Sequence, residues 1–297
     1  MLIDTHAHLN FSSFKKDLDE VIKRTLAENI RVINVGSKYE TSRKAVEIAE
    51  KYEEGIYAAV GLHPIHATPD FIKKRIEPEE GGFLASGEDF SKEKYLELAK
   101  SKKVVAIGEI GLDYYYRPKT KKKIEEFKNK QKEVFLKQLG LAEELDLPVI
   151  IHCRMAHQDV ADILKFQISS TKSQKNPNFQ NSKLRGVVHC FTGTLAEAQE
   201  YIKMGFYIGI NGIIFSALGG PASGGKLPLD EVIKEIPLDK ILIETDCPYL
   251  TPPQEEDKRN EPIFVKYVVE KIAGLKNLNY EKIAEATTQN ARNLFRI

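Results

Sequence analysis

Short apolar runs rich in valine and isoleucine alternate along the chain with longer amphipathic segments. The runs have the length and β-branched content of buried strands, and the segments between them repeat apolar positions every three or four residues, as surface helices do. The pattern predicts strands at 2–5, 31–35, 56–60, 104–109, 148–152, 186–189, 206–210 and 240–245. It predicts helices at 16–29, 41–52, 89–100, 121–145, 157–165, 194–204, 230–236, 261–273 and 280–294.

Eight strands, each followed by a helix, favour an α/β fold of the (β/α)8 TIM-barrel type. No GxGxxG run follows the first strand, which argues against an open doubly wound sheet. A barrel of this type commonly takes about 250 residues, so the 297 residues require no second domain. We therefore expect one domain over 1–297, with a surface loop at 169–183 and a flexible turn at 219–225.

Charge and hydropathy exclude some function classes. The 44 basic and 43 acidic side chains give a net charge of +1, so no global field draws the protein to nucleic acid or an anionic membrane, and any polyanion must bind a local patch. The chain enters a strand at once and has no apolar run near the roughly 20 residues that span a bilayer. We expect a cytoplasmic protein with no membrane association and no obligate protein partner.

The three cysteines cannot form a closed set of disulfides, which fits a reducing compartment. Cys153, Cys190 and Cys247 each directly follow a histidine or an aspartate. Adjacent strand residues face opposite sides, so these thiols are predicted to face the helix layer as packing groups. The alternative roles are zinc thiolates or nucleophiles.

The seven histidines gather at the ends of predicted strands. His6 and His8, one residue apart, project to the same side of a strand and can grip one cation, whereas the alternative is a pair of ordinary polar residues at a strand end. The positions of the other histidines favour the metal site. They are His63, His66, His152, His157 and His189.

Residues at the carboxyl ends of barrel strands meet around one mouth. At these ends lie His6, His8, His63, Glu109, His152, His189 and Asp246. Setting His63 aside, four imidazoles and two carboxylates exceed what one cation takes from protein. Glu109, midway round the ring, could bridge two cations and hold a hydroxide between them. We expect two divalent metal ions, either Mg²⁺, Mn²⁺ or Zn²⁺.

Seven runs in this order resemble the signatures of the TatD-like metal-dependent DNases. They are DTHAHL at 4–9, GLHP at 61–64, GEIGLDY at 108–114, HCR at 152–154, HCFTG at 189–193, ETDCPYL at 244–250 and RNEP at 259–262. The resemblance implies a hydrolase barrel of the amidohydrolase type. It implies a first metal at His6, His8 and Asp246, a second at His152 and His189, Glu109 shared by both, and His63 on the scissile phosphate. Cys247 stands where family members often carry serine.

Several roles remain open from the residues alone. Asp246 is predicted to be both a metal ligand and the general base. An unpaired carboxylate at Glu109, on an apolar strand, would cost several kcal/mol in burial, which favours a cation beside it. His63 could be a ligand, a phosphate donor or a capping side chain, with the donor favoured. Arg154 could bind phosphate or form a salt bridge with Glu109 or Asp113. His66 and His157 are interpreted as polar groups of a loop or a helix start.

An aromatic and basic run, YYYRPKTKKK at 114–123, leaves the fourth strand toward the predicted active face. Rings interleaved with cations suit single-stranded nucleic acid, and Tyr114 and Arg154 are the predicted substrate contacts together with His63. The alternative is a merely solvated surface.

The leading hypothesis is a divalent-metal-dependent deoxyribonuclease that uses a metal-activated water, with DNA as substrate, single-stranded or at 3′ ends. The second is an amidohydrolase-like esterase or deacylase, for example on aminoacyl-tRNA, since the fold does not settle the chemistry. Related barrels often bridge their metals with a modified lysine, and Glu109 at that place favours the phosphodiesterase. A binding protein with a vestigial site is disfavoured because all six ligands are present.

Overall fold

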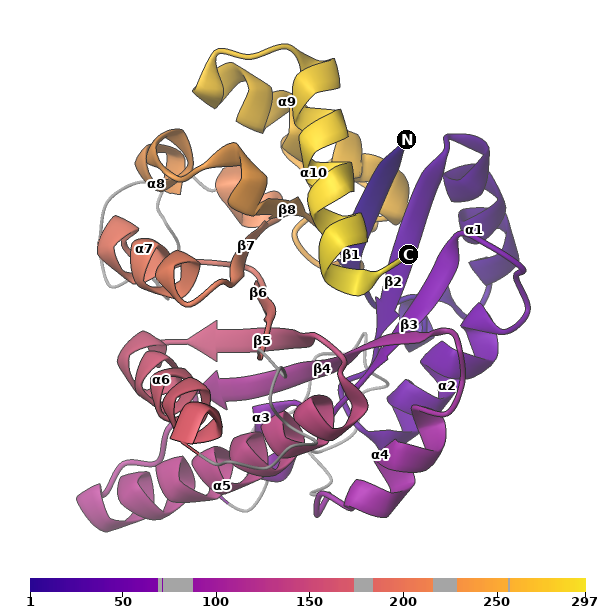
Figure 1. Cartoon of the computed structure of the whole chain (residues 1–297). Coiled ribbons are helices and arrows are strands. Elements are labelled where there is room, and N and C mark those ends of the chain that lie inside the picture. Colours follow the sequence, from indigo (N-terminus) through magenta and orange to yellow (C-terminus); the bar gives the residue numbers. More distant parts are fainter. Residues whose placement is uncertain (69–70, 72–87, 174–183, 216–228, 256) are drawn as a thin grey trace.

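The computed structural model describes residues 1–68, 71, 88–173, 184–215, 229–255 and 257–297. Its eight strands form one parallel sheet in the order β1 to β8, which curls into a nearly closed barrel (Figure 1). The strands are β1 (Leu2–Ala7), β2 (Ile30–Val35), β3 (Ile56–Val60), β4 (Val104–Asp113), β5 (Val149–Arg154), β6 (Gly186–Val188), β7 (Tyr207–Ile210) and β8 (Ile241–Ile243). All eight predicted strands are present, and the predicted barrel is confirmed.

Helices surround the barrel on its outer side (Figure 1). Those within the described residues are α1 (Leu18–Ala27), α2 (Tyr39–Ala49), α3 (Pro64–Ala67), α4 (Lys92–Leu98), α5 (Lys121–Leu145), α6 (His157–Ser173), α7 (Leu195–Lys203), α8 (Leu229–Glu235), α9 (Val265–Lys276) and α10 (Tyr280–Phe295). The apolar sides of the amphipathic helices contribute buried residues to the core that lies between helices and strands.

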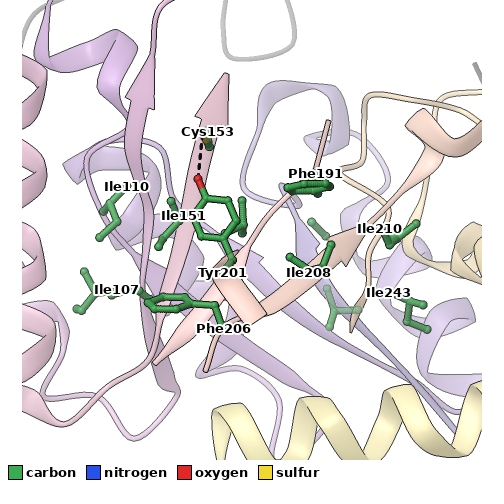
Figure 2. Packing of buried hydrophobic residues seen from close by; sticks show 14 of the residues in the cluster. Ile107, Ile110, Ile151, Cys153, Phe191, Tyr201, Phe206, Ile208, Ile210 and Ile243 are labelled. Carbon is green, nitrogen blue, oxygen red and sulfur yellow. Dashed lines mark hydrogen bonds between the residues drawn. The ribbon is translucent and has the colours of Figure 1, made fainter. Parts of the chain in front are cut away.

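Two hydrophobic cores hold the layers together. The larger fills the space between strands and helices, where Ile151 and Ile208 pack near Phe206 and the hydroxyl of Tyr201 points at Cys153 (Figure 2). The smaller lies inside the barrel and joins inward strand residues to Ala291, Leu294 and Phe295 of α10. Helix α10 therefore closes the amino-terminal end of the barrel, and the opposite end is left for the site.

The last strand meets the first through a short seam. A single bridge joins Ala7 to Cys247, and the buried carboxylate of Asp4 accepts hydrogen bonds from the backbone N–H and the hydroxyl of Thr245 at 2.9 and 2.6 Å. Burial raises the pKa of Asp4 to about 8. The seam keeps the end of β1 beside the segment that follows β8.

Some boundaries differ from the sequence prediction. Helix α6 runs to Ser173, so the start of the predicted loop at 169–183 is helical. Its remainder, and the predicted loop at 219–225, lie outside the described residues. None of the helices in the described part of the chain is long and apolar enough to cross a membrane.

Candidate metal centre

The six predicted ligands come together at the carboxyl-terminal mouth of the barrel. His6 lies on β1 and His8 directly follows it, Glu109 lies on β4 and His152 on β5, and His189 and Asp246 follow the ends of β6 and β8. Ligand atoms lie within 4.8 Å of one another in His6, His8 and Asp246 and in His6, Glu109 and His189, whereas the set that contains His152 joins it to His63 and Asp113.

Glu109 stands at the centre of the group, with its two oxygens facing different imidazoles. Oε2 lies 3.6 Å from Nε2 of His6 and 3.9 Å from Nε2 of His8. Oε1 lies 2.7 Å from Nδ1 of His152 and 3.8 Å from Nε2 of His189. One carboxylate therefore touches both histidine pairs.

Asp246 reaches the same centre from the other side of the seam. Its backbone N–H donates to the carbonyl of His6, and the N–H of His8 donates to the carbonyl of Cys247, both at 2.8 Å. Its Oδ1 lies 3.5 Å from Nε2 of His8 and 3.8 Å from Nε2 of both His6 and His189. The backbone pairing thus places the Asp246 carboxylate against His6 and His8.

The tautomer of His8 shows that this arrangement fits a cation. Nδ1 of His8 lies 2.9 Å from the carbonyl of Val35, which can only accept, so Nδ1 carries the proton. A neutral His8 then aims the lone pair of Nε2 at the carboxylates of Glu109 and Asp246. Lone pair and carboxylate repel unless a positive charge lies between them. Although burial opposes it, Asp246 raises the pKa of His8, so a proton supplies that charge where no metal cation does. Two ligands of one cation at about 2.1 Å are roughly 3.0 to 3.4 Å apart. Nε2 of His8 lies 3.2 Å from Nε2 of His6, 3.5 Å from Asp246 Oδ1 and 3.9 Å from Glu109 Oε2, so only the first of these distances is within that range.

Burial opposes the ionised form of Glu109, but the surrounding imidazoles, His63 first among them, hold its pKa well below its usual range. Burial is likewise outweighed at Asp246, chiefly by His189, and the pKa of Asp246 is lowered. For His152, hydrogen bonds to Asp113 and Glu109 overcome burial and raise the pKa to about 9. Both carboxylates are therefore ionised, and protons occupy positions for which a cation would compete.

Two buried carboxylates lie behind the ligands and were not predicted as site residues. Asp113 Oδ2 lies 3.1 Å from Nε2 of His152. Glu244 Oε1 lies 2.9 Å from Nδ1 of His189, although not along the direction of a hydrogen bond, and accepts the N–H of Cys190 at 2.6 Å. Each belongs to a motif that also contains a ligand. The sequence held a signal for both residues, because Asp113 lies four positions after Glu109 and Glu244 lies two positions before Asp246.

His63 takes the capping role, one of the three roles left open by the sequence. It is the N-cap of α3, and its Nδ1 accepts the N–H of Ile65 at 3.1 Å. Burial, reinforced by the charge of His152, lowers the pKa of His63 to about 3. A neutral ring whose Nδ1 is an acceptor carries its proton on Nε2, and Nε2 lies 3.6 Å from Oε1 of Glu109. His63 thus presents an N–H donor to the site.

The predicted substrate contacts fall into two groups. Arg154 makes no ion pair with Glu109 or Asp113; its guanidinium lies 3.8 Å from the ring centre of Tyr115 and 5.5 Å from that of Tyr116. Tyr114, by contrast, is buried, with its hydroxyl 2.8 Å from Asp159. The prediction that Tyr114 contacts the substrate is therefore corrected: its ring packs in the core and offers no face to a base.

The cysteines also divide. Cys153 and Cys247 are buried in the core between strands and helices, as predicted. Cys190 does not face the helix layer, because β6 ends at Val188 and strand alternation no longer applies; its Sγ lies near ligand atoms of His189 and Asp246. His66 and His157 lie in short α3 and at the first position of α6, as interpreted from the sequence.

Known proteins match this chain over nearly its whole length. The family model described as TatD related DNase matches residues 3–296. The chain is 45% identical over 300 residues to the uncharacterized metal-dependent hydrolase YabD of Bacillus subtilis and covers 100% of both chains. It is 32% identical over 304 residues to the 3′-5′ ssDNA/RNA exonuclease TatD of Erwinia tasmaniensis, again over 100% of both. The crystal structure of the TatD homolog YJJV from Escherichia coli K12 superposes with a TM-score of 0.76 at 28% identity, covering 100% of this chain and 98% of the other.

Proposed function

The chain belongs to the family of TatD-related DNases, and from this premise we propose that it hydrolyses phosphodiester bonds in DNA, on single strands or at 3′ ends. The family makes it a metal-dependent hydrolase. The match over 3–296 supports treating 1–297 as one barrel domain.

One observation carries the proposal: the two oxygens of Glu109 face separate histidine pairs. This supports a site for two divalent cations, in which His6, His8 and Asp246 would hold one, His152 and His189 would hold the other, and Glu109 would serve both. When bound, such ions activate a water and neutralise charge on the phosphate oxygens.

The remaining groups suit attack on phosphorus. Asp246 is ionised, because its imidazole neighbours lower its pKa, and can accept the proton of the attacking water. His63 can donate its Nε2–H to a non-bridging oxygen of the scissile phosphate. Tyr115 and Arg154 form a stacked pair at the end of β4 and β5, which suits a base or a phosphate of a single strand.

The test uses metal-depleted protein with Mg²⁺, Mn²⁺ or Zn²⁺ restored singly. End-labelled single-stranded DNA, duplex DNA and single-stranded RNA are assayed beside an aminoacyl-tRNA ester. We expect metal-dependent cleavage of single-stranded DNA, lost with EDTA and lowered by orders of magnitude in Glu109→Ala and Asp246→Ala variants that keep the wild-type circular dichroism spectrum.

Two outcomes would reject the proposal. Unchanged nuclease activity in either variant would separate the activity from this site. Turnover of the aminoacyl ester without cleavage of any nucleic acid would instead establish the deacylase alternative, for which no contact in the described residues argues specifically.

A further inference from the structure

His152 lies between two buried carboxylates, one on each ring nitrogen. Nδ1 is 2.7 Å from Oε1 of Glu109, on the side of the metal centre. Nε2 is 3.1 Å from Oδ2 of Asp113, on the opposite side. If His152 holds a cation beside Glu109, it must do so through Nδ1, and its proton must then be on Nε2.

Asp113 is itself held firmly, so it can direct the ring. Its backbone N–H donates to Oε1 of Gln131 at 2.9 Å, and Nε2 of Gln131 donates back to the carbonyl of Asp113 at 3.1 Å. Its second oxygen, Oδ1, accepts the N–H of Tyr115 at 2.9 Å. Each carboxylate oxygen of Asp113 therefore has its own partner, Oδ1 the N–H of Tyr115 and Oδ2 the Nε2 of His152, and the residue is almost fully buried.

We propose that Asp113 is a positioning residue of the metal centre: it accepts the Nε2 proton of His152 and so selects the tautomer whose Nδ1 lone pair faces the second cation. The proposal rests on the proposed two-metal function. A carboxylate behind an imidazole ligand fixes ring orientation and raises ligand basicity. No other residue contacts the outer nitrogen of His152 in the hydrogen bonds of the described chain.

The carboxylate of Asp113 contacts both His152 and the segment that follows β4. Its Oδ1 holds the backbone of Tyr115, whose ring stacks on Arg154. Orientation of a metal ligand and of the proposed substrate-binding pair thus depends on one side chain.

Asp113→Asn separates positioning from packing, because asparagine has nearly the same shape. Its one amide oxygen can accept from Tyr115 or from His152, but not from both in the wild-type manner. With the oxygen on Tyr115, the amide NH₂ faces Nε2 of His152, and the ring must carry its proton on Nδ1. That tautomer has no lone pair for the cation.

The experiment titrates metal-free protein with Zn²⁺ in a calorimeter. Wild-type protein should bind two ions per chain. Asp113→Asn should weaken one binding event about 10- to 100-fold and leave the other within about threefold, so that its titration resembles that of His152→Ala. In the His152→Ala background, Asp113→Asn should have no further effect on affinity.

Asp159→Asn is the matched control, since Asp159 is a carboxylate near the same segment that bonds Tyr114 and Lys132 rather than a ligand. It should leave both binding events unchanged. Wild-type affinities in Asp113→Asn, or equal loss of both events, would overturn the proposal.

A second measurement needs no variant. In Zn²⁺-loaded wild-type protein with ¹⁵N-labelled histidine, long-range ¹H–¹⁵N correlation should show His152 protonated on Nε2. Protonation on Nδ1 would refute the role of Asp113 even where the variant fails to fold. Failure of the wild type to bind any divalent ion would reject the proposed function as a whole, whereas two bound ions with an indifferent Asp113→Asn reject this inference alone.

Discussion

Replacing His63 by alanine removes an N–H donor whose position follows from one backbone contact. Because the N–H of Ile65 occupies Nδ1, the proton of the neutral ring is on Nε2, which lies 3.6 Å from Oε1 of Glu109. Loss of one such donor to a developing oxyanion costs about 10²- to 10³-fold in kcat, or about 2.7 to 4 kcal/mol. We expect His63→Ala to lower kcat on single-stranded DNA by this factor.

The same substitution removes a helix cap, so it also affects stability. Loss of an N-cap costs about 1 kcal/mol, and the free energy of unfolding should fall by about that amount in urea titrations. His63→Gln keeps an N–H donor of similar reach and should recover at least tenfold of the lost kcat, without restoring the bond to Ile65. The matched control is His66→Ala on the same short helix, which should change kcat less than threefold when assayed well below its Tm.

Two results would contradict this reasoning. A His63→Ala variant with kcat within threefold of wild type would show that no donor acts from this position. A variant that loses one of two bound cations in a Zn²⁺ titration would show that His63 is a ligand, because a phosphate donor leaves cation affinity nearly unchanged.

Three further predictions concern binding, backbone geometry and pH. Tyr115→Ala removes a stacking ring and should raise KM for single-stranded DNA about tenfold, within the roughly 1 to 3 kcal/mol of one stacked base, with kcat nearly unchanged in steady-state assays. Gly108→Ala places a methyl group 2.6 Å from Cβ of Ile150, and chemical denaturation should show a loss of about 1 to 3 kcal/mol; its control, Gly140→Ala on open helix surface, should stabilise by up to about 1 kcal/mol. Burial opposes ionisation of Asp159, but hydrogen bonds from a lysine and a tyrosine lower its pKa. Its contribution is therefore present above the unfolded pKa, about 3.9, and lost as pH falls through the lower folded pKa. Asp159→Asn should accordingly lower Tm at pH 7, and the difference in Tm from wild type should shrink as the pH falls through the folded pKa of Asp159.

Much of the fold could be predicted because the alternation of an apolar strand and an amphipathic helix repeats along the chain. Strand 56–60 and helix 121–145 have the predicted bounds. The strand is a continuous apolar run and the helix is long, so in each the hydrophobic pattern is clear up to the ends. Strand β4 runs four residues beyond its predicted end at Glu109, because it continues to pair with β5 as far as Arg154. Pairing between strands is a tertiary interaction that no local pattern contains.

Gathering of the six expected ligands also followed from a general rule, that the carboxyl ends of barrel strands share one mouth. The directions of the side chains just beyond the strand ends did not follow from this rule. Tyr114, one residue past β4, turns into the core, and Cys190, two past β6, turns toward the ligands. Once the ladder ends, the direction of a side chain depends on the loop backbone, and Cys190 has a φ of 45°.

The inward direction of Glu109 depends on a break in strand alternation. Ile107 packs in the outer core, so strict alternation would send residue 109 to the same outer side. In the β4–β5 register, however, Glu109 has no counterpart, and this bulge shifts the phase by one residue. Ile110 then packs outward, while Glu109 and Asp113 both turn to the ring of His152. One extra residue in β4 thus places the bridging carboxylate on one nitrogen of His152 and the positioning carboxylate on the other, which makes the bulge, rather than residue types alone, responsible for this half of the centre.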